Sequence, residues 1–141
     1  MRYYLDTNML VFMLLNNKNC ISRKVDNIIS DFSNILYASS IAVNELILLY
    51  KSGKIELRSC KSAEDIISEI KRFGIEIVYY NQYHLAKYAA LEIAGGHKDM
   101  NDHAIIAQAI ADKIPLVSSD TDLYCYTAQG LNLIFNKRVG R

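Results

Sequence analysis

The apolar and polar positions follow two patterns that alternate along the chain. Short runs rich in β-branched and aromatic residues predict five strands, at 2–5, 34–39, 75–80, 114–119 and 131–135. Between them, apolar residues recur at helical spacing and predict helices at 8–16, 22–32, 41–51, 62–73, 83–94 and 101–112. Strands that alternate with helices of this length pair in parallel through right-handed crossovers. We therefore predict an α/β fold in a single domain over residues 1–141, a three-layer α/β/α sandwich around a central, mostly parallel five-stranded sheet.

The composition limits the partners and the compartment. The chain has 16 Lys and Arg against 15 Asp and Glu, so its net charge of +1 cannot hold a polyanion and any contact with nucleic acid must be local. Three widely spaced cysteines without a CxxC pair argue against a disulfide framework and a zinc knuckle. No apolar run reaches the roughly 18 residues that a bilayer requires, and the N-terminus lacks the features of a secretory signal. We expect a soluble, cytoplasmic protein without a membrane partner.

Two predicted strands end in an aspartate. Asp6 follows the run at 2–5, and Asp120 closes the run at 114–119. On an open parallel sheet, ligands bind outside the carboxyl ends of the strands, where these two acids would lie. Taken alone, each acid is better explained by a turn or a helix cap. A functional role therefore depends on whether other carboxylates reach the same place.

Glu45 is the first of these further acids. The residues one helical turn away from it are all apolar: Ile41, Ala42, Leu48 and Leu49. A carboxylate on such a face is expected to be at least half buried, and it then needs a cation, a hydrogen bond or a raised pKa. The alternative is that Glu45 lies on a narrow solvent-exposed stripe together with Asn44.

Asp99 and Asp102 stand three residues apart at the start of the helix predicted at 101–112. Asp99 fits an N-cap, and Asp102 would then occupy the capping-box position. Asp102 also continues the apolar stripe formed by Ile105 and Ile106, so we expect it to face inward.

Four acids thus converge in the predicted fold: Asp6, Glu45, Asp102 and Asp120. Four negative charges in one place repel one another, and a divalent cation removes that repulsion. Because we expect only oxygen ligands here, without His or Cys partners, the cation should be Mg²⁺ or Mn²⁺ and not zinc. Carboxylate-bound metals of this kind are typical of phosphate-ester chemistry.

Four segments resemble, in order and spacing, the motifs of the PIN-domain family and particularly its VapC-like ribonuclease toxins of type II toxin–antitoxin pairs. They are LDTN at 5–8, SIAVNEL at 40–46, KDMNDHAIIAQA at 98–109 and VSSDTDL at 117–123. The resemblance spans the whole chain and implies that the four acids are both the catalytic and the metal-binding residues. It gives Ser118 the place of a small hydroxyl residue near the last acid and Asn8 that of a polar residue that braces the first. Asp99 completes the supporting set as the helix cap.

The resemblance implies a Mg²⁺- or Mn²⁺-dependent endoribonuclease that hydrolyses RNA phosphodiester bonds, forms a homodimer and is inhibited by a small antitoxin protein. Asp6, Asp102 and Asp120 would hold metal directly, while Glu45 would bind a second ion or orient the attacking water. Two alternatives stay open: a PIN-like RNA-binding or assembly module, and a housekeeping RNA-processing nuclease without an antitoxin. A haloacid-dehalogenase-type phosphatase is disfavoured, because Asn8 stands where that class needs a second Asp.

Further residues could contact substrate or partners. His103 departs from the third motif and is expected to face solvent, with a phosphate contact as the alternative. Phosphate contacts could come from either of two basic groups: Lys51, Lys54, Arg58 and Lys61, or Lys137, Arg138 and Arg141. The apolar stretches at 8–15 and 21–32 are either ordinary core or a surface for a second copy or an antitoxin.

Overall fold

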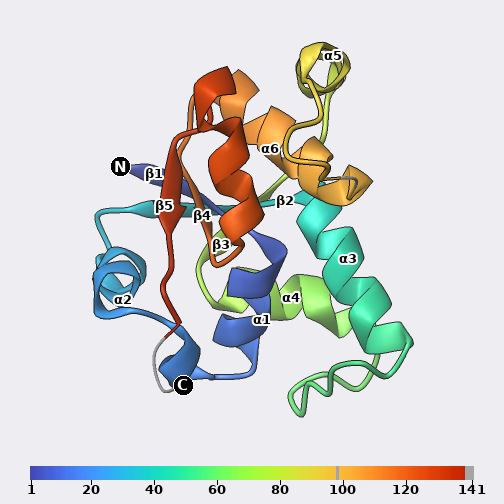
Figure 1. The fold of residues 1–141 in the computed structure, drawn as a ribbon. Helices are drawn as coiled ribbons and strands as arrows, with labels where there is room; N and C mark the ends of the chain where they lie inside the picture. The colour runs from blue at the N-terminus through green and yellow to red at the C-terminus, as the bar shows by residue number, and fades with distance from the viewer. Residues whose placement is uncertain (98, 139–141) are drawn as a thin grey trace.

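A computed structural model describes residues 1–97 and 99–138 and contains one five-stranded sheet (Figure 1). Its strands are β1 (Arg2–Leu5), β2 (Ile35–Ser39), β3 (Ile75–Val78), β4 (Leu116–Ser118) and β5 (Leu133–Phe135). Their order across the sheet is β3-β2-β1-β4-β5, and every neighbouring pair is parallel. All five predicted strands are therefore present, and the predicted α/β fold is confirmed.

Six α-helices flank the described sheet: α1 (Thr7–Leu14), α2 (Arg23–Ser30), α3 (Ser40–Lys51), α4 (Asp65–Arg72), α5 (Gln82–Ala90) and α6 (Met100–Asp112). Figure 1 shows α5 and α6 on one side of the sheet and α1 and α4 on the other. Two 3₁₀ helices, η1 (Lys18–Cys20) and η2 (Thr121–Gln129), were not predicted. None of the helices in the described ranges combines the length and apolarity that crossing a membrane requires.

The largest error in a predicted helix boundary concerns the segment after α5. The apolar spacing predicted a helix up to residue 94, but α5 ends at Ala90 and the chain becomes extended at Leu91. The polar groups of the following backbone bond to η2 instead of to a further helical turn. Glu92 exchanges two hydrogen bonds with the side chain of Gln129, and the Ala94 N–H donates to the Tyr126 hydroxyl. These tertiary contacts outweigh the local helical pattern.

The core holds most of the apolar stretch at 8–15. Met9, Leu10, Phe12 and Met13 are all buried, so this part of the chain is ordinary core. Helix α6 is buried at seven consecutive positions, 103–109, which is consistent with its place between α5 and the sheet. Phe32, at the end of the second apolar stretch, is by contrast fully exposed.

Buried polar side chains fix α5 and α6 against the sheet. His84 Nε2 lies 2.9 and 3.0 Å from the two carboxylate oxygens of Asp112, and the hydroxyl of Tyr4 on β1 also donates to Asp112. Gln108 donates to the same Tyr4 hydroxyl and accepts a bond of 2.6 Å from Ser39 on β2. Buried polar groups specify a single packing when all of them are bonded, so this network sets how α6 lies over the strands.

The strand order places a ligand crevice between β1 and β4. From β1 the chain adds β2 and β3 on one side, and it then returns to add β4 and β5 on the other. Ligands of open parallel sheets bind at such a reversal, outside the carboxyl ends of the strands. Asp6 directly follows β1 and Asp120 lies two residues beyond β4, so both acids stand at this point.

Candidate active site

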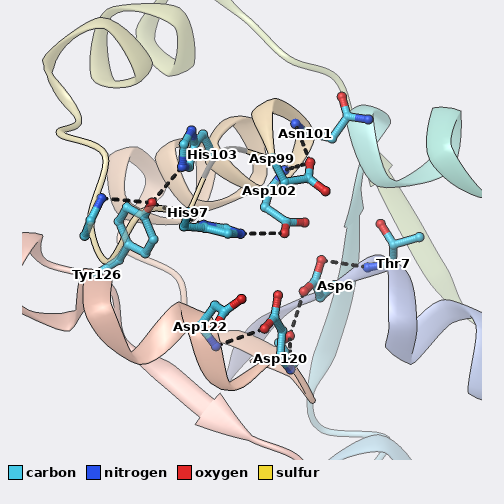
Figure 2. Close-up of polar contacts among 12 residues, drawn as sticks. Asp6, Thr7, His97, Asp99, Asn101, Asp102, His103, Asp120, Asp122 and Tyr126 are labelled. Carbon is cyan, nitrogen blue, oxygen red and sulfur yellow. Dashed lines mark hydrogen bonds and ion pairs between the residues drawn. The ribbon is translucent and has the colours of Figure 1, made fainter.

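Three of the four predicted acids line one cleft of about 310 Å³ at the carboxyl edge of the sheet. Figure 2 shows the side chains of Asp6, Asp102 and Asp120 directed toward a common space from β1, α6 and η2. The rest of the lining consists of Thr7, Asn8, Val11, Phe12, Leu49 and Arg138. The cleft therefore brings Asp6 together with two acids that follow it by more than 90 residues in the chain.

Asp6 is held in one orientation by its neighbours. The residue is 3% exposed, and its side chain caps α1 by accepting a bond of 2.8 Å from the Thr7 N–H. The other carboxylate oxygen accepts from the Ser118 hydroxyl at 2.6 Å and from the Asn8 amide at 3.4 Å. Burial raises the pKa of Asp6, while the Ser118 and Thr7 bonds act to lower it. Asn8 bonds the first acid, and Ser118, which was expected near the last acid, bonds both the Asp6 carboxylate and the Asp120 N–H.

Asp102 faces inward from the first turn of α6. The predicted N-cap is present, because Asp99 accepts bonds from the N–H groups of Asn101 and Asp102. The Asp102 carboxylate makes no capping-box bond in the described chain and instead lies 3.0 Å from His97 Nε2. Burial is the main cause that raises the pKa of Asp102 to about 7, and the charges of Asp6, Asp99 and Glu45 act in the same direction.

Asp120 caps η2 by accepting a bond of 2.9 Å from the Asp122 N–H. Its own N–H donates to the Ser118 hydroxyl at 3.0 Å. The same hydroxyl bonds the Asp6 carboxylate, so Ser118 connects the two strand ends that carry acids. Capping explains the backbone geometry at Asp6 and at Asp120, but it uses only part of each carboxylate.

Glu45 lies beside the cleft and is joined to it through Thr7. The Thr7 hydroxyl donates a bond of 2.9 Å to Glu45 Oε1, while the Thr7 N–H bonds Asp6. Burial raises the pKa of Glu45, and the charges of Asp6 and Asp99 add to the shift. Asn44 is exposed, whereas Glu45 is partly buried and bonded. The alternative of a shared solvent-exposed stripe is therefore wrong.

His97, which lies in the loop before α6, was not predicted to belong to the site. Ligand atoms of His97, Asp102 and Asp120 all fall within 4.8 Å of one another. The expectation that only oxygen donors meet here is wrong for this reason. No periodic pattern marks a loop residue, and the Gly95-Gly96 pair indicated only that the preceding helix ends.

The prediction that His103 faces solvent is also wrong. His103 is 6% exposed, and its Nε2 atom lies 2.6 Å from the buried hydroxyl of Tyr126. His103 packs against Tyr126 of η2, an element that was not predicted, and lines a small cavity together with Tyr88 of α5. Burial lowers the pKa of His103, and the neighbouring His97 acts in the same direction.

One of the two predicted basic groups reaches the cleft. Arg138 lines it and lies over the Phe12 ring at 4.8 Å from the ring centroid. Arg58 lines a separate cavity together with Glu69 and Arg72. Arg141 lies outside the described residues.

The family model of the PIN domain matches residues 3–128. The chain belongs to the PIN-domain family. Members of this family are nucleases, and the predicted membership of the PIN-domain family is confirmed. No curated protein matches this PIN domain significantly in sequence.

Solved structures of toxin–antitoxin complexes share the fold of this PIN domain. A chain of DNA-bound VapBC2 from Rickettsia felis is 22% identical with a TM-score of 0.65, and the match covers 97% of this chain and 100% of that one. A chain of DNA-bound VapBC from Salmonella typhimurium is 20% identical with a TM-score of 0.65, covering 96% and 98%. A chain of VapBC-1 from nontypeable Haemophilus influenzae is 20% identical with a TM-score of 0.63, also covering 96% and 98%.

Proposed function

We propose that this PIN domain is a Mg²⁺- or Mn²⁺-dependent endoribonuclease that hydrolyses RNA phosphodiester bonds and serves as the toxin of a toxin–antitoxin pair. The observation that carries the proposal is the convergence of Asp6, Asp102 and Asp120 on one cleft at the reversal point of the sheet. Family membership supports the nuclease, and the likeness to chains of VapBC complexes supports the toxin.

The donor set of the cleft fits a divalent cation. Asp6, Asp102 and Asp120 would hold it, and Glu45 would bind a second ion or orient the attacking water. The raised pKa values of Asp6, Glu45 and Asp102 reflect burial and mutual repulsion, and a positive ion between the carboxylates relieves that repulsion. When bound, the ion would activate water as a nucleophile and stabilise negative charge on phosphorus.

The surrounding residues have separate tasks in hydrolysis. Ser118, Asn8 and the Thr7 N–H fix the Asp6 carboxylate, and the Thr7 hydroxyl fixes Glu45. Arg138 stands at the edge of the cleft, where its guanidinium would contact a substrate phosphate. The water oxygen would bond to phosphorus and release a proton, while the opposite bond from phosphorus to the 3′ oxygen breaks and that oxygen takes up a proton. The products are a 5′-phosphate and a 3′-hydroxyl.

We also propose that a small antitoxin inhibits this protein. A second proposal is that this protein itself forms a homodimer. A short neighbouring reading frame for a DNA-binding protein is expected for a toxin and not for a housekeeping nuclease. Light scattering coupled to size-exclusion chromatography would give twice the mass of the chain for the dimer.

The non-enzymatic alternative, an RNA-binding or assembly module, has no need of four acids around one site, and we therefore prefer the enzyme.

Cleavage of a 5′-labelled single-stranded RNA tests the proposal. The wild-type protein should cut it with Mn²⁺ or Mg²⁺ and not with EDTA, while Asp6→Asn should abolish cleavage in a protein that still folds, as circular dichroism would check. Asn retains the acceptor that caps α1. Asp26→Asn, an exposed acid on α2, is the matched control and should cut like the wild type. Wild-type cleavage by Asp6→Asn would refute the site assignment, and a wild-type protein that cuts no RNA with either metal would favour the binding module.

A further inference from the structure

We propose that His97 supplies a nitrogen ligand to the divalent cation held by Asp102 and Asp120. The inference rests on the proposed metal-dependent function and specifies the ligands of that same site. The four acidic motifs contain only oxygen donors at these positions, so His97 adds a ligand that those motifs do not include. The consequence would be a cation preference particular to this chain.

The distances among the three side chains suit one six-coordinate ion. His97 Nε2 lies 3.0 Å from Asp102 Oδ2, and the ligand atoms of His97, Asp102 and Asp120 all lie within 4.8 Å of one another. Metal–ligand bonds of about 2.1 Å place adjacent ligand atoms about 3 Å apart and opposite ones about 4.2 Å apart. Side-chain shifts of less than about 1 Å would therefore bring all three ligand atoms to bonding distance of one cation.

The loop that carries His97 is fixed against η2. Gly95 has a φ of +61°, and a Cβ at this position would come within 3.0 Å of the Cys125 sulfur. Glycine alone suits both the left-handed backbone and the close approach. The Ala94 N–H bonds the Tyr126 hydroxyl at 3.3 Å. The imidazole of His97 is thereby held at the cleft with only 9% of its side chain exposed.

The hydrogen bonds behind His97 suit a metal-bound imidazole. If Nε2 binds a cation, the ring proton lies on Nδ1, which is 3.2 Å from the Tyr126 hydroxyl oxygen (Figure 2). That oxygen can accept from His97 Nδ1 and from Ala94, and its own hydrogen can go to His103 Nε2 at 2.6 Å. One tautomer of each histidine therefore satisfies all of these contacts. Ligating histidines generally donate their second ring N–H in this way, which fixes the ring orientation.

A purely structural role for His97 makes different predictions. If the imidazole only balanced the charge of Asp102, it would stay off the cation and would not affect which ion binds. As a ligand, imidazole adds most to the affinity for Co²⁺, less to that for Mn²⁺ and least to that for Mg²⁺, which prefers oxygen ligands. Replacing it should therefore weaken Co²⁺ binding about tenfold or more and Mn²⁺ binding by a smaller factor, with little change for Mg²⁺.

Electron spin echo envelope modulation of the Mn²⁺-loaded protein tests the proposal directly. The wild-type protein should show coupling of Mn²⁺ to a ¹⁴N nucleus, and labelling histidine with ¹⁵N should convert the signal to that of ¹⁵N. The His97→Gln variant should lose the coupling. The His103→Gln variant should keep it, because the His103 ring bonds Tyr126 and lies behind His97. Isothermal titration with Mn²⁺, Co²⁺ and Mg²⁺ gives the cation preference of each variant.

The outcomes separate this inference from the proposed function. Mn²⁺-dependent RNA cleavage without histidine coupling would overturn the role of His97 and leave the nuclease intact. Histidine coupling lost in His97→Gln, in a protein that cuts no RNA, would support the ligand and overturn the nuclease. Coupling that persists in His97→Gln, or a wild-type protein that binds no Mn²⁺, would overturn the inference.

Discussion

Ser118 donates a hydrogen bond of 2.6 Å to Oδ2 of Asp6, a residue 112 positions earlier in the chain. The same hydroxyl accepts bonds from the Asp120 N–H at 3.0 Å and from the Asn8 amide at 3.2 Å. A single buried hydroxyl therefore sets the distance between two acids on neighbouring strand ends. We interpret Ser118 as a residue that positions the acids of the cleft without touching substrate.

Ser118→Ala should weaken both the fold and the metal site. It leaves a buried Asp6 oxygen without its shortest bond, which costs about 1–3 kcal/mol of unfolding free energy. Residues that orient metal ligands typically contribute about 10–100-fold in affinity. Differential scanning fluorimetry should show a lower melting temperature, and titration calorimetry should show weaker Mn²⁺ binding. Ser33→Ala, at an exposed serine, is the control. Unchanged Mn²⁺ affinity in Ser118→Ala would contradict the positioning role.

The metal-free protein should lose stability as the pH rises. The pKa of Asp102 is about 7 in the folded protein and is raised from its ordinary value of 3.8. Between about pH 4 and pH 7, the folded protein therefore binds a proton that the unfolded chain has released, so the free energy of unfolding falls with pH across this window. Asp6 and Glu45, whose pKa values are also raised, act in the same direction.

Asp102→Asn removes the carboxyl group whose raised pKa causes this loss of stability. In EDTA at pH 8 the variant should melt about 3–5 °C higher than the wild type, which corresponds to about 1 kcal/mol in a domain of this size. At pH 5 the difference should shrink. Added Mn²⁺ should stabilise the wild type at pH 8 and not the variant. A metal-free wild type that is more stable at pH 8 than at pH 5, with no gain in Asp102→Asn, would rule out the repulsion described at the cleft.

Arg138→Gln should affect the substrate and not the cation. The guanidinium lies at the edge of the cleft over Phe12, and the proposed role is a contact with a phosphate. Removing one phosphate contact should raise the KM for RNA and flatten its dependence on salt by about one unit of log–log slope. Mn²⁺ affinity should stay at the wild-type value. Arg58→Gln, which alters a different cavity, is the matched control. Equal KM values for Arg138→Gln and the wild type would exclude the contact.

The sequence predicted those parts of the fold and site that depend on local patterns. Each strand was a short apolar run, and Asp6 and Asp120 were identified because each follows such a run. Glu45 and Asp102 were identified because their charges interrupt apolar helical stripes. These four acids can be identified without knowledge of the tertiary structure, because strand ends and helix faces determine where a side chain points.

The remaining residues depend on contacts between distant segments. His97 reaches Asp102 only because the chain leaves the helical path at Leu91 and packs its loop against Tyr126. His103 packs against Tyr126 of η2. The apolar residues of η2 have no clear helical period, so this element was not predicted. A loop conformation selected by tertiary hydrogen bonds has no counterpart in the spacing of apolar residues.

A crystal structure of the protein soaked in Mn²⁺, with anomalous scattering recorded at the manganese edge, tests the central claim most directly. The account predicts an anomalous peak in the cleft, about 2.2 Å from carboxylate oxygens of Asp6, Asp102 and Asp120. A saturated crystal with no peak in this cleft, or with manganese bound only elsewhere on the molecule, would contradict it.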